Sequence, residues 1–433
     1  MSLIQPRTLK GFRDLMPAQA LRRARLLRIV EDVFRAHGYG PIDSPIIEYA
    51  EIIKGKTGGD TDKEIFEFTD KGGREVALRN DLTVPLARYV AQHEGQLVFP
   101  FRRYHIGLVY RGERPQRGRA REFLQCDADL IGPTGVAADA EALITMAAVY
   151  EALDVGDVTL RVNDRRVLNG LLESIGARDK AVVVLRALDK REKLGDDTVR
   201  KEMAEAGIAD DDITRVLDAC TPREDNDATL AALESLVGET ELGRAGIDGL
   251  RTVQALFVAS GRRPGALKFD PSIARGLDYY TGIVVEAQLD ALPDIGSVGA
   301  GGRYDDLAGL YTKSTLPGVG FTIGLTRLMD ALEALGEETG AQSTSEVMVT
   351  FGGEEGLPAA FAFAAELRRA GHAAEVFPQK KKHGQQMRYA DRKGIPYVFT
   401  HNEDGSWYGK RLSDGETTTV ADAAAAAAWL GAK

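Results

Sequence analysis

The stretch YHIGLVYRGERPQRGRAREFLQCDADLIG, residues 104–132, decides the fold of this chain of 433 residues. Apolar and polar residues alternate at both of its ends, which is the pattern of two β-strands. Most charged residues of the turn-rich segment between these runs are arginines. They are Arg111, Arg114, Arg117, Arg119 and Arg121, and the acidic residues are Glu113 and Glu122. We therefore expect an antiparallel hairpin whose cationic tip binds polyanions.

The returning strand of this hairpin carries a polar face. Gln125, Asp127 and Asp129 lie on one side of the alternation, where a plain core strand would carry Val or Ile. A polar face next to a cationic tip predicts a small polar ligand on the sheet and an anionic ligand at the tip.

Length and composition are those of an ordinary globular protein. A chain of 433 residues predicts two or three domains, and 44% hydrophobic with 28% charged residues is a typical composition. The net charge of −10 argues against a general nucleic-acid coat. Any nucleic-acid binding must therefore use local basic patches such as the hairpin tip.

The cysteines and the N-terminus indicate a reducing compartment. Cys126 and Cys220 are the two cysteines, and neither belongs to a CxxC pair, so we expect no disulfide framework and no zinc cluster. The start of the chain has no apolar core of signal-peptide length, and no run is long enough to span a bilayer. We expect a cytoplasmic protein that does not enter a membrane.

The first hundred residues predict a helix and a small sheet. Helical spacing of apolar residues covers 18–37, and two short strands, 64–70 and 74–81, flank the turn at 71–73. Asp81 and Thr83 lie where the second strand becomes a helix. This segment alone favours an N-cap role for Asp81, and the alternative is a contact with a ligand ammonium group.

Further along, the pattern predicts a helix over 136–153, a strand over 156–164 and a helical insertion over 165–262 whose charges are solvated faces. Strands return between 267 and 323, and a helix begins near Leu325. After a polar linker, strands and helices alternate from 345 to about 430, which predicts a compact α/β domain.

Several stretches together resemble the histidyl-tRNA synthetase family of class II aminoacyl-tRNA synthetases. The likeness to motif 2 spans 110–132, and the likeness to motif 3 is carried by GVGFTIGLTRLMDAL (318–332). The two signature segments of the family are similar to ARGLDYYTGIVVEA (274–287) and AGGRYDDL (300–307). Motif 1 resembles GYGPIDSPIIE, and LRNDLTVPLARY and LRVNDRR are closer to the eukaryote-like branch.

This resemblance implies an α+β architecture. The expected class II catalytic domain, residues 1–340, has a mixed, mainly antiparallel sheet with flanking helices. Motif 1 covers about 20–50, motif 2 104–132 and motif 3 318–335, with the helical insertion 165–262 inside the domain. An anticodon-binding α/β domain is expected over 345–433, and the family implies a homodimer.

The resemblance also implies the reaction. Histidine and ATP would form histidyl-adenylate, and the histidyl group would then pass to tRNA(His). Fixed cations are the main device for such a transfer, because negative charge builds on the phosphoryl oxygens. The residues that match the family's catalytic positions are Arg111, Arg275 and Gln125, and those that match its ATP contacts are Arg111, Glu113, Arg119, Phe123 and Arg327. Mg²⁺ is expected on the ATP phosphates, with no metal site made by protein ligands.

Histidine recognition requires a partner for each imidazole nitrogen and for the ammonium and carboxylate groups. The matching residues are Asp81, Thr83, Gln125, Asp129, Arg275, Tyr279 and Tyr280. Because consecutive strand residues face opposite sides, one of the two tyrosines packs inward, and we favour Tyr280 as the ligand contact.

For the other basic residues, two interpretations stay open: a solvated charge or a contact with tRNA. Arg114 and Arg117 are either solvated or contacts of the tRNA acceptor stem. Residues 380–382, three lysines, are either a solvated face or a contact of the anticodon loop. One departure from the family pattern concerns motif 3, where Thr326 replaces the usual acidic residue before Arg327 and bears on the orientation of that arginine.

Two other functions were weighed against ligation. A regulatory paralogue, acting as a subunit of ATP phosphoribosyltransferase, would lack the anticodon-binding domain and both phosphate arginines, yet 345–430, Arg111 and Arg275 are all present. A sensor of uncharged tRNA would carry kinase-type segments, and no glycine-rich loop with an HRD pattern occurs.

Overall fold

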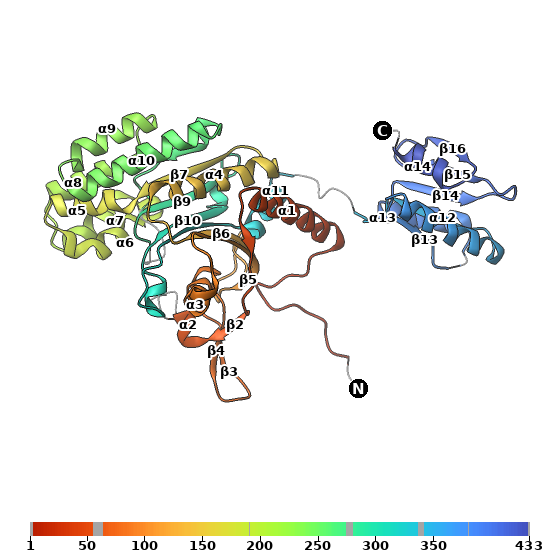
Figure 1. The fold of residues 1–433 in the computed structure, drawn as a ribbon, viewed down its shortest axis with the longest axis horizontal. Helices are drawn as coiled ribbons and strands as arrows, with labels where there is room; N and C mark the ends of the chain where they lie inside the picture. Colours follow the sequence, from red (N-terminus) through yellow and green to blue (C-terminus); the bar gives the residue numbers. More distant parts are fainter. Residues whose placement is uncertain are drawn as a thin grey trace. The chain divides into compact units, whose positions relative to one another are not determined.

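The computed structural model describes residues 3–54, 64–189, 191–273, 280–336, 342–379 and 381–431. The chain divides into two compact units, Met1–Arg13 with Arg28–Gly336 and Asp14–Leu27 with Glu337–Lys433 (Figure 1). Arg275, Tyr279 and Lys380 lie outside the described residues, so their expected roles stay predictions.

An eight-stranded mixed sheet forms the centre of the first unit, in the order β1-β5-β6-β11-β10-β9-β7-β8. Its strands are β1 (Gly40–Pro41), β5 (Phe101–Tyr110), β6 (Glu122–Ile131), β7 (Val158–Asp164), β8 (Leu267–Phe269), β9 (Ile283–Leu289), β10 (Gly299–Tyr304) and β11 (Gly318–Ile323). The pairs β1–β5 and β7–β8 are parallel, and the other neighbours are antiparallel. The predicted hairpin is confirmed, since β5 and β6 pair over their whole lengths.

A smaller sheet lies before the hairpin in the chain. Its strands are β2 (Ile47–Tyr49), β3 (Glu67–Thr69) and β4 (Glu75–Leu78), in the order β2-β4-β3. The helices of this part of the chain are α1 (Pro17–Ala36), α2 (Ala50–Lys54) and α3 (Thr83–His93), of which α2 packs on β2 and β4. The turn expected between β3 and β4 is confirmed, and Gly73 supplies its left-handed residue with a φ of 77°.

One long helix precedes β7 in the chain, and a series of helices follows it. They are α4 (Val136–Leu153), α5 (Arg165–Ser174), α6 (Ala181–Asp189), α7 (Arg191–Glu205), α8 (Asp210–Ala219), α9 (Asn226–Val237) and α10 (Glu241–Ala259). In Figure 1, α5 to α10 run from yellow to green and gather beside β7. The long helix α10 packs on α5, on α4 and on β7, so it joins this helical group to the sheet. Helix α11 (Leu325–Ala334) follows β11.

The C-terminal residues form a five-stranded sheet in the order β13-β12-β14-β15-β16. Its elements are β12 (Val347–Thr350), α12 (Leu357–Arg369), β13 (Ala374–Val376), α13 (His383–Lys393), β14 (Tyr397–His401), β15 (Trp407–Arg411), β16 (Thr417–Val420) and α14 (Ala423–Gly431). The strand–helix alternation is confirmed as far as β14. The antiparallel strands β15 and β16 were not predicted, because both are short and mix Gly, Lys and Thr with few apolar residues.

Short 3₁₀ helices complete the chain: η2 (Glu94–Gln96), η3 (Arg178–Lys180), η4 (Pro264–Ala266), η5 (Pro293–Ile295), η6 (Ala308–Leu310) and η7 (Glu354–Gly356). Within the described ranges, no helix combines the length and the apolar character that a membrane crossing requires.

The contact between α5 and α10 leads to a first prediction. A Cβ at Gly170 would lie 2.6 Å from the backbone nitrogen of Gly243, so Gly170→Ala must push the two helices apart. We expect the free energy of unfolding to fall by about 1–3 kcal/mol, measured by chemical denaturation. Gly309→Ala is the control, since no atom lies within 4 Å of its added Cβ. Equal effects of the two changes would contradict the close approach.

Candidate active site

A cavity of about 490 Å³ lies on the large sheet of the first unit. Strands β6, β9, β10 and β11 line it, together with the chain at the start of α3 and of α11. The expected site residues that line it are Asp81, Thr83, Arg111, Glu113, Arg119, Phe123, Gln125, Asp129, Tyr280 and Arg327. Arg114 and Arg117 are not among its lining residues, and Arg117 instead lines a separate hollow beside Phe12 and Asp330.

Strand β6 runs along the cavity and presents one face to it. Phe123, Gln125, Asp127 and Asp129 all line the cavity, as the alternation predicted. At about 3.3 Å per residue, Phe123 and Asp129 lie roughly 20 Å apart along the strand. One ligand can therefore meet the arginines at one end of β6 and the carboxylates at the other.

Glycines on β10 and β11 make room beside this face. A Cβ at Gly320 would lie 2.1 Å from Oδ1 of Asp129, and a Cβ at Gly302, which lies opposite Gly320 on β10, would lie 2.6 Å from the carbonyl oxygen of Ile283. Both positions face close backbone or carboxylate atoms, so neither accepts a side chain without movement. The floor of the cavity is therefore bare backbone.

A buried ion pair closes the carboxylate end. Arg103 on β5 lies opposite Asp129 on β6, and Nη2 of Arg103 is 2.6 Å from Oδ2 of Asp129. The hydroxyl of Tyr304 donates to Oδ1 of the same carboxylate. Burial raises the pKa of Asp129, and Arg103 opposes that shift. Neither Arg103 nor Tyr304 was predicted as a site residue, although the hairpin register places Arg103 beside Asp129.

The structure confirms the capping role expected for Asp81 and also places its side chain in the cavity lining, while its contact with a ligand ammonium group stays a prediction. The backbone N–H of Val84 donates to Oδ1 of Asp81 at 2.9 Å, so the carboxylate caps the first turn of α3, although Leu82 occupies the N-cap position. The same side chain lines the cavity and is buried. Burial raises the pKa of Asp81, and the N–H of Val84 opposes the shift.

A backbone carbonyl holds Arg111 and a carboxylate holds Arg119 at the other end of the cavity. Nε of Arg111 donates to the carbonyl oxygen of Asn80 at 3.0 Å, and its guanidinium carbon lies 5.1 Å from the centre of the Phe123 ring. Nη1 of Arg119 donates to Glu113 at 3.1 Å. These contacts fix the cations before a ligand arrives, which is how preorganised charges act.

Thr326, which precedes Arg327, makes a contact with β6 that the sequence did not predict. Its Oγ1 accepts a 2.9 Å hydrogen bond from the backbone N–H of Leu124, which joins the start of α11 to β6. Nε of Arg327 donates to the carbonyl oxygen of Gly118 at 2.9 Å, so Arg327 also contacts the hairpin tip. An acidic residue at 326 could accept the same N–H, so Thr326 replaces it as an acceptor without its charge.

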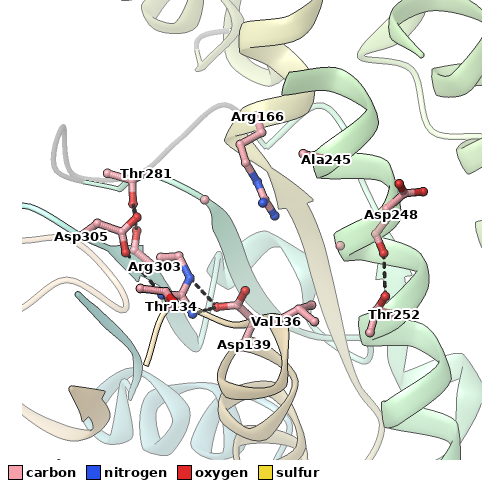
Figure 2. A pocket seen from close by; sticks show the side chains of 12 residues that line it. Thr134, Val136, Asp139, Arg166, Ala245, Asp248, Thr252, Thr281, Arg303 and Asp305 are labelled. Atoms are coloured by element: carbon pink, nitrogen blue, oxygen red, sulfur yellow. Dashed lines mark hydrogen bonds and ion pairs between the residues drawn. The ribbon is translucent and has the colours of Figure 1, made fainter. Parts of the chain in front are cut away.

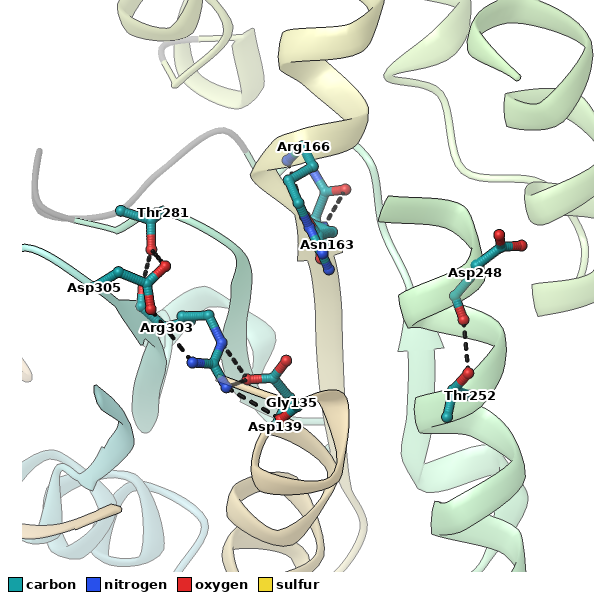
Figure 3. A network of polar contacts seen from close by, with 10 residues as sticks. Gly135, Asp139, Asn163, Arg166, Asp248, Thr252, Thr281, Arg303 and Asp305 are labelled. Atoms are coloured by element: carbon teal, nitrogen blue, oxygen red, sulfur yellow. Dashed lines mark hydrogen bonds and ion pairs between the residues drawn. The ribbon is translucent and has the colours of Figure 1, made fainter. Parts of the chain in front are cut away.

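A second cavity of about 340 Å³ separates α10 from the start of α4 and the end of β10 (Figure 2). Arg303 lies at its edge and donates from Nε to Asp139 on α4 at 2.8 Å. Figure 3 shows the network around this pair, in which Thr281 donates to Asp305 at 2.6 Å. Burial raises the pKa of Asp139 to about 6, and Arg303 opposes the shift. Since Thr281 follows Tyr280, the network anchors the backbone next to a cavity-lining tyrosine.

The Arg103–Asp129 pair yields a stability prediction. Arg103→Met leaves a buried carboxylate without its cation, so we expect the free energy of unfolding to fall by about 3–5 kcal/mol in denaturant titrations. Adding Asp129→Asn removes the unpaired charge and should restore part of that loss. A single Arg103→Met variant as stable as the unchanged protein would show that the pair does not hold the hairpin.

Comparisons with known proteins identify the family. The model of the histidyl-tRNA synthetase family matches residues 11–328, and that of the anticodon binding domain matches residues 346–406. Histidine--tRNA ligase of Rhodopirellula baltica is 46% identical, covering 97% of this chain and 96% of that protein. The enzyme of the same name from Wolinella succinogenes is 42% identical, covering 93% and 92%.

Among solved structures, histidyl-tRNA synthetase from Nostoc sp. PCC 7120 superposes with a TM-score of 0.89 at 30% identity, covering 99% of both chains. The curated relatives are bacterial, so they do not support the expected closeness to the eukaryote-like branch. The family model spans most of the sequence and the relatives cover almost all of it, and the chain therefore belongs to the histidyl-tRNA synthetase family.

Proposed function

We propose that this chain joins L-histidine to tRNA(His) with ATP, through a histidyl-adenylate intermediate. One observation carries the proposal: a single cavity holds preset arginines at one end of β6 and buried carboxylates at the other. Relatives named Histidine--tRNA ligase match this chain over more than nine-tenths of their length.

In the first step, a carboxylate oxygen of histidine attacks the α-phosphorus of ATP, and pyrophosphate leaves. Two anions approach each other, so positive charge near the reacting phosphate lowers the barrier. We assign Arg111 and Arg275 to the α-phosphate, and Arg119 and Arg327 to the other phosphates. Phe123 packs on adenine and Glu113 contacts its edge, because both line the arginine end of the cavity.

We propose that Mg²⁺ binds mainly through the phosphates of ATP. The described residues contain no cluster of three or more His, Cys, Asp or Glu side chains that could hold a metal ion. When bound, the ion would neutralise charge on the β- and γ-phosphates, with water completing its coordination.

Histidine occupies the carboxylate end in this proposal. Asp129 and Tyr280 face the two imidazole nitrogens, and Asp81, Thr83 and Gln125 contact the ammonium and carboxylate groups, with Tyr279 and Arg275 adjoining. A site that pairs both ring nitrogens rejects apolar amino acids by roughly 10⁴ or more, because its buried polar groups would otherwise be left unpaired.

In the second step, the histidyl group passes to the terminal ribose of tRNA(His). Arg114 and Arg117 are assigned to the acceptor stem, since both lie on the hairpin tip but outside the cavity lining. We assign residues 1–340 to catalysis, with the insertion 165–262 inside them, and residues 345–433 to the anticodon. We also propose a homodimer in the cytoplasm.

The two rival functions have less support. A regulatory subunit of ATP phosphoribosyltransferase without an anticodon-binding domain does not fit the match over 346–406. An uncharged-tRNA sensor does not account for the fixed arginines of the cavity, which a protein without turnover would not need.

The proposal is tested by histidine-dependent exchange of pyrophosphate into ATP. Arg111→Ala should lower the exchange rate roughly 100-fold or more, since one preorganised cation at the phosphate is lost. Arg102→Ala is the matched control: Arg102 lies on β5, the strand that ends just before Arg111, but its side chain pairs with Glu141 at 3.0 Å, away from the cavity. Exchange that does not need histidine would refute the proposed activity.

A second variant tests the assignment made from the family pattern alone. Arg275→Ala should lower the same exchange rate by roughly two orders of magnitude, because a second phosphate cation is removed. Thermal unfolding of the variant serves as the control for folding. A rate within about threefold of the unchanged enzyme would remove Arg275 from the chemistry.

A further inference from the structure

Asp127 is a third carboxylate at the histidine end of the cavity, and the proposed function leaves it without a role. It lies on β6 between Gln125 and Asp129 and lines the cavity with them. The strand rise places it roughly 7 Å from each neighbour on the same face. It therefore faces the middle of a ligand that reaches from Gln125 to Asp129.

The other two carboxylates are already engaged. Asp129 pairs with Arg103 at 2.6 Å and accepts from Tyr304, and Asp81 accepts the N–H of Val84. Oδ1 of Asp127 is also buried and has no hydrogen-bond partner among the described residues; the Asp129 oxygen that shares this lack, Oδ2, is compensated by its ion pair with Arg103. A buried oxygen left without a donor is destabilising by about 1–3 kcal/mol, so this position favours a donor from a ligand.

The charge around Asp127 also favours a cationic ligand group. Burial raises its pKa to about 7, Arg103 opposes that shift, and Asp129 and Asp81 push the pKa further upward. At neutral pH, the permanent cation of histidine is the α-ammonium group, because an imidazole of pKa about 6.5 is mostly neutral. An ammonium at this position would relieve the repulsion among the carboxylates.

We propose that Asp127 binds the α-ammonium group of histidine beside Asp81, and that it selects amino acids over imidazole compounds that lack an amino group. The inference rests on the proposed function. The alternative is a structural one, in which Asp127 serves only as a second counter-ion of Arg103.

Calorimetric titration of the full chain with three probes tests this assignment: histidine, histidinol and 3-(imidazol-4-yl)propionate. Histidinol keeps the ammonium group and the imidazole, whereas the propionate lacks the ammonium group. In Asp127→Asn, histidine and histidinol should bind roughly 10- to 100-fold more weakly, the loss expected for a charge-assisted hydrogen bond. The propionate should bind within about threefold of its affinity for the unchanged protein.

Asp139→Asn is the matched control, since Asp139 is another buried carboxylate with a raised pKa but lies outside this cavity. It should leave the ratio of the three affinities unchanged. Thermal unfolding adds a second readout: Asp127→Asn should not destabilise the protein, whereas loss of a structural counter-ion of Arg103 would lower its melting temperature.

The outcomes separate the two proposals. If the unchanged protein binds none of the probes, the proposed function fails and this inference fails with it. If it binds histidine, but Asp127→Asn weakens all three probes equally or none of them, only the role of Asp127 is rejected. Asp127→Ser repeats the test if the Asn variant does not fold, and unfolding of both variants would assign Asp127 to the fold and reject the inference.

Discussion

The buried pair between Arg103 and Asp129 is the interaction on which the rest of the cavity depends. Two charges without exposure to water are tolerated only when they face each other, and the register of β5 and β6 places them directly opposite. The pair fixes the Asp129 carboxylate against Tyr304 of β10, and so it joins the hairpin to the far side of the cavity. Bare glycine backbone on β11 leaves the space that this carboxylate fills.

Along β6, the charge of the cavity lining changes from negative near the Arg103–Asp129 pair to positive at the other end. Carboxylates surround the deep end, the amide of Gln125 lies between, and arginines held by backbone carbonyls meet the other end near Phe123. An amino acid has its cation and its carboxylate in the same order. The arrangement can therefore orient the carboxylate of a bound amino acid toward a phosphate before any reaction occurs, which lowers the entropic part of the barrier.

Sequence patterns predicted much of this arrangement, because β6 alternates strictly and its polar face cannot be a core face. Ten of the twelve expected site residues that the structure describes line the cavity, and three of them, Phe123, Gln125 and Asp129, do so because of this alternation. Arg103 escaped prediction because an arginine in a strand, here next to Arg102, suggests an exposed charge, and only the pairing register shows its partner. Thr326 and Asp81 were ambiguous for a similar reason: a short polar side chain at a helix start serves the backbone and the site at once. Strands β15 and β16 lack a clear period and depend on β14 for their edge.

The glycines of the cavity floor restrict how this protein can change over evolutionary time. Gly302 and Gly320 face atoms within 2.6 Å of any added Cβ, so the floor at these positions cannot be reshaped by stepwise substitution. New amino-acid preferences would have to arise from exchanges on β6 and at Tyr304 opposite it. A laboratory library aimed at a different substrate would therefore diversify those positions and leave the glycine strands untouched.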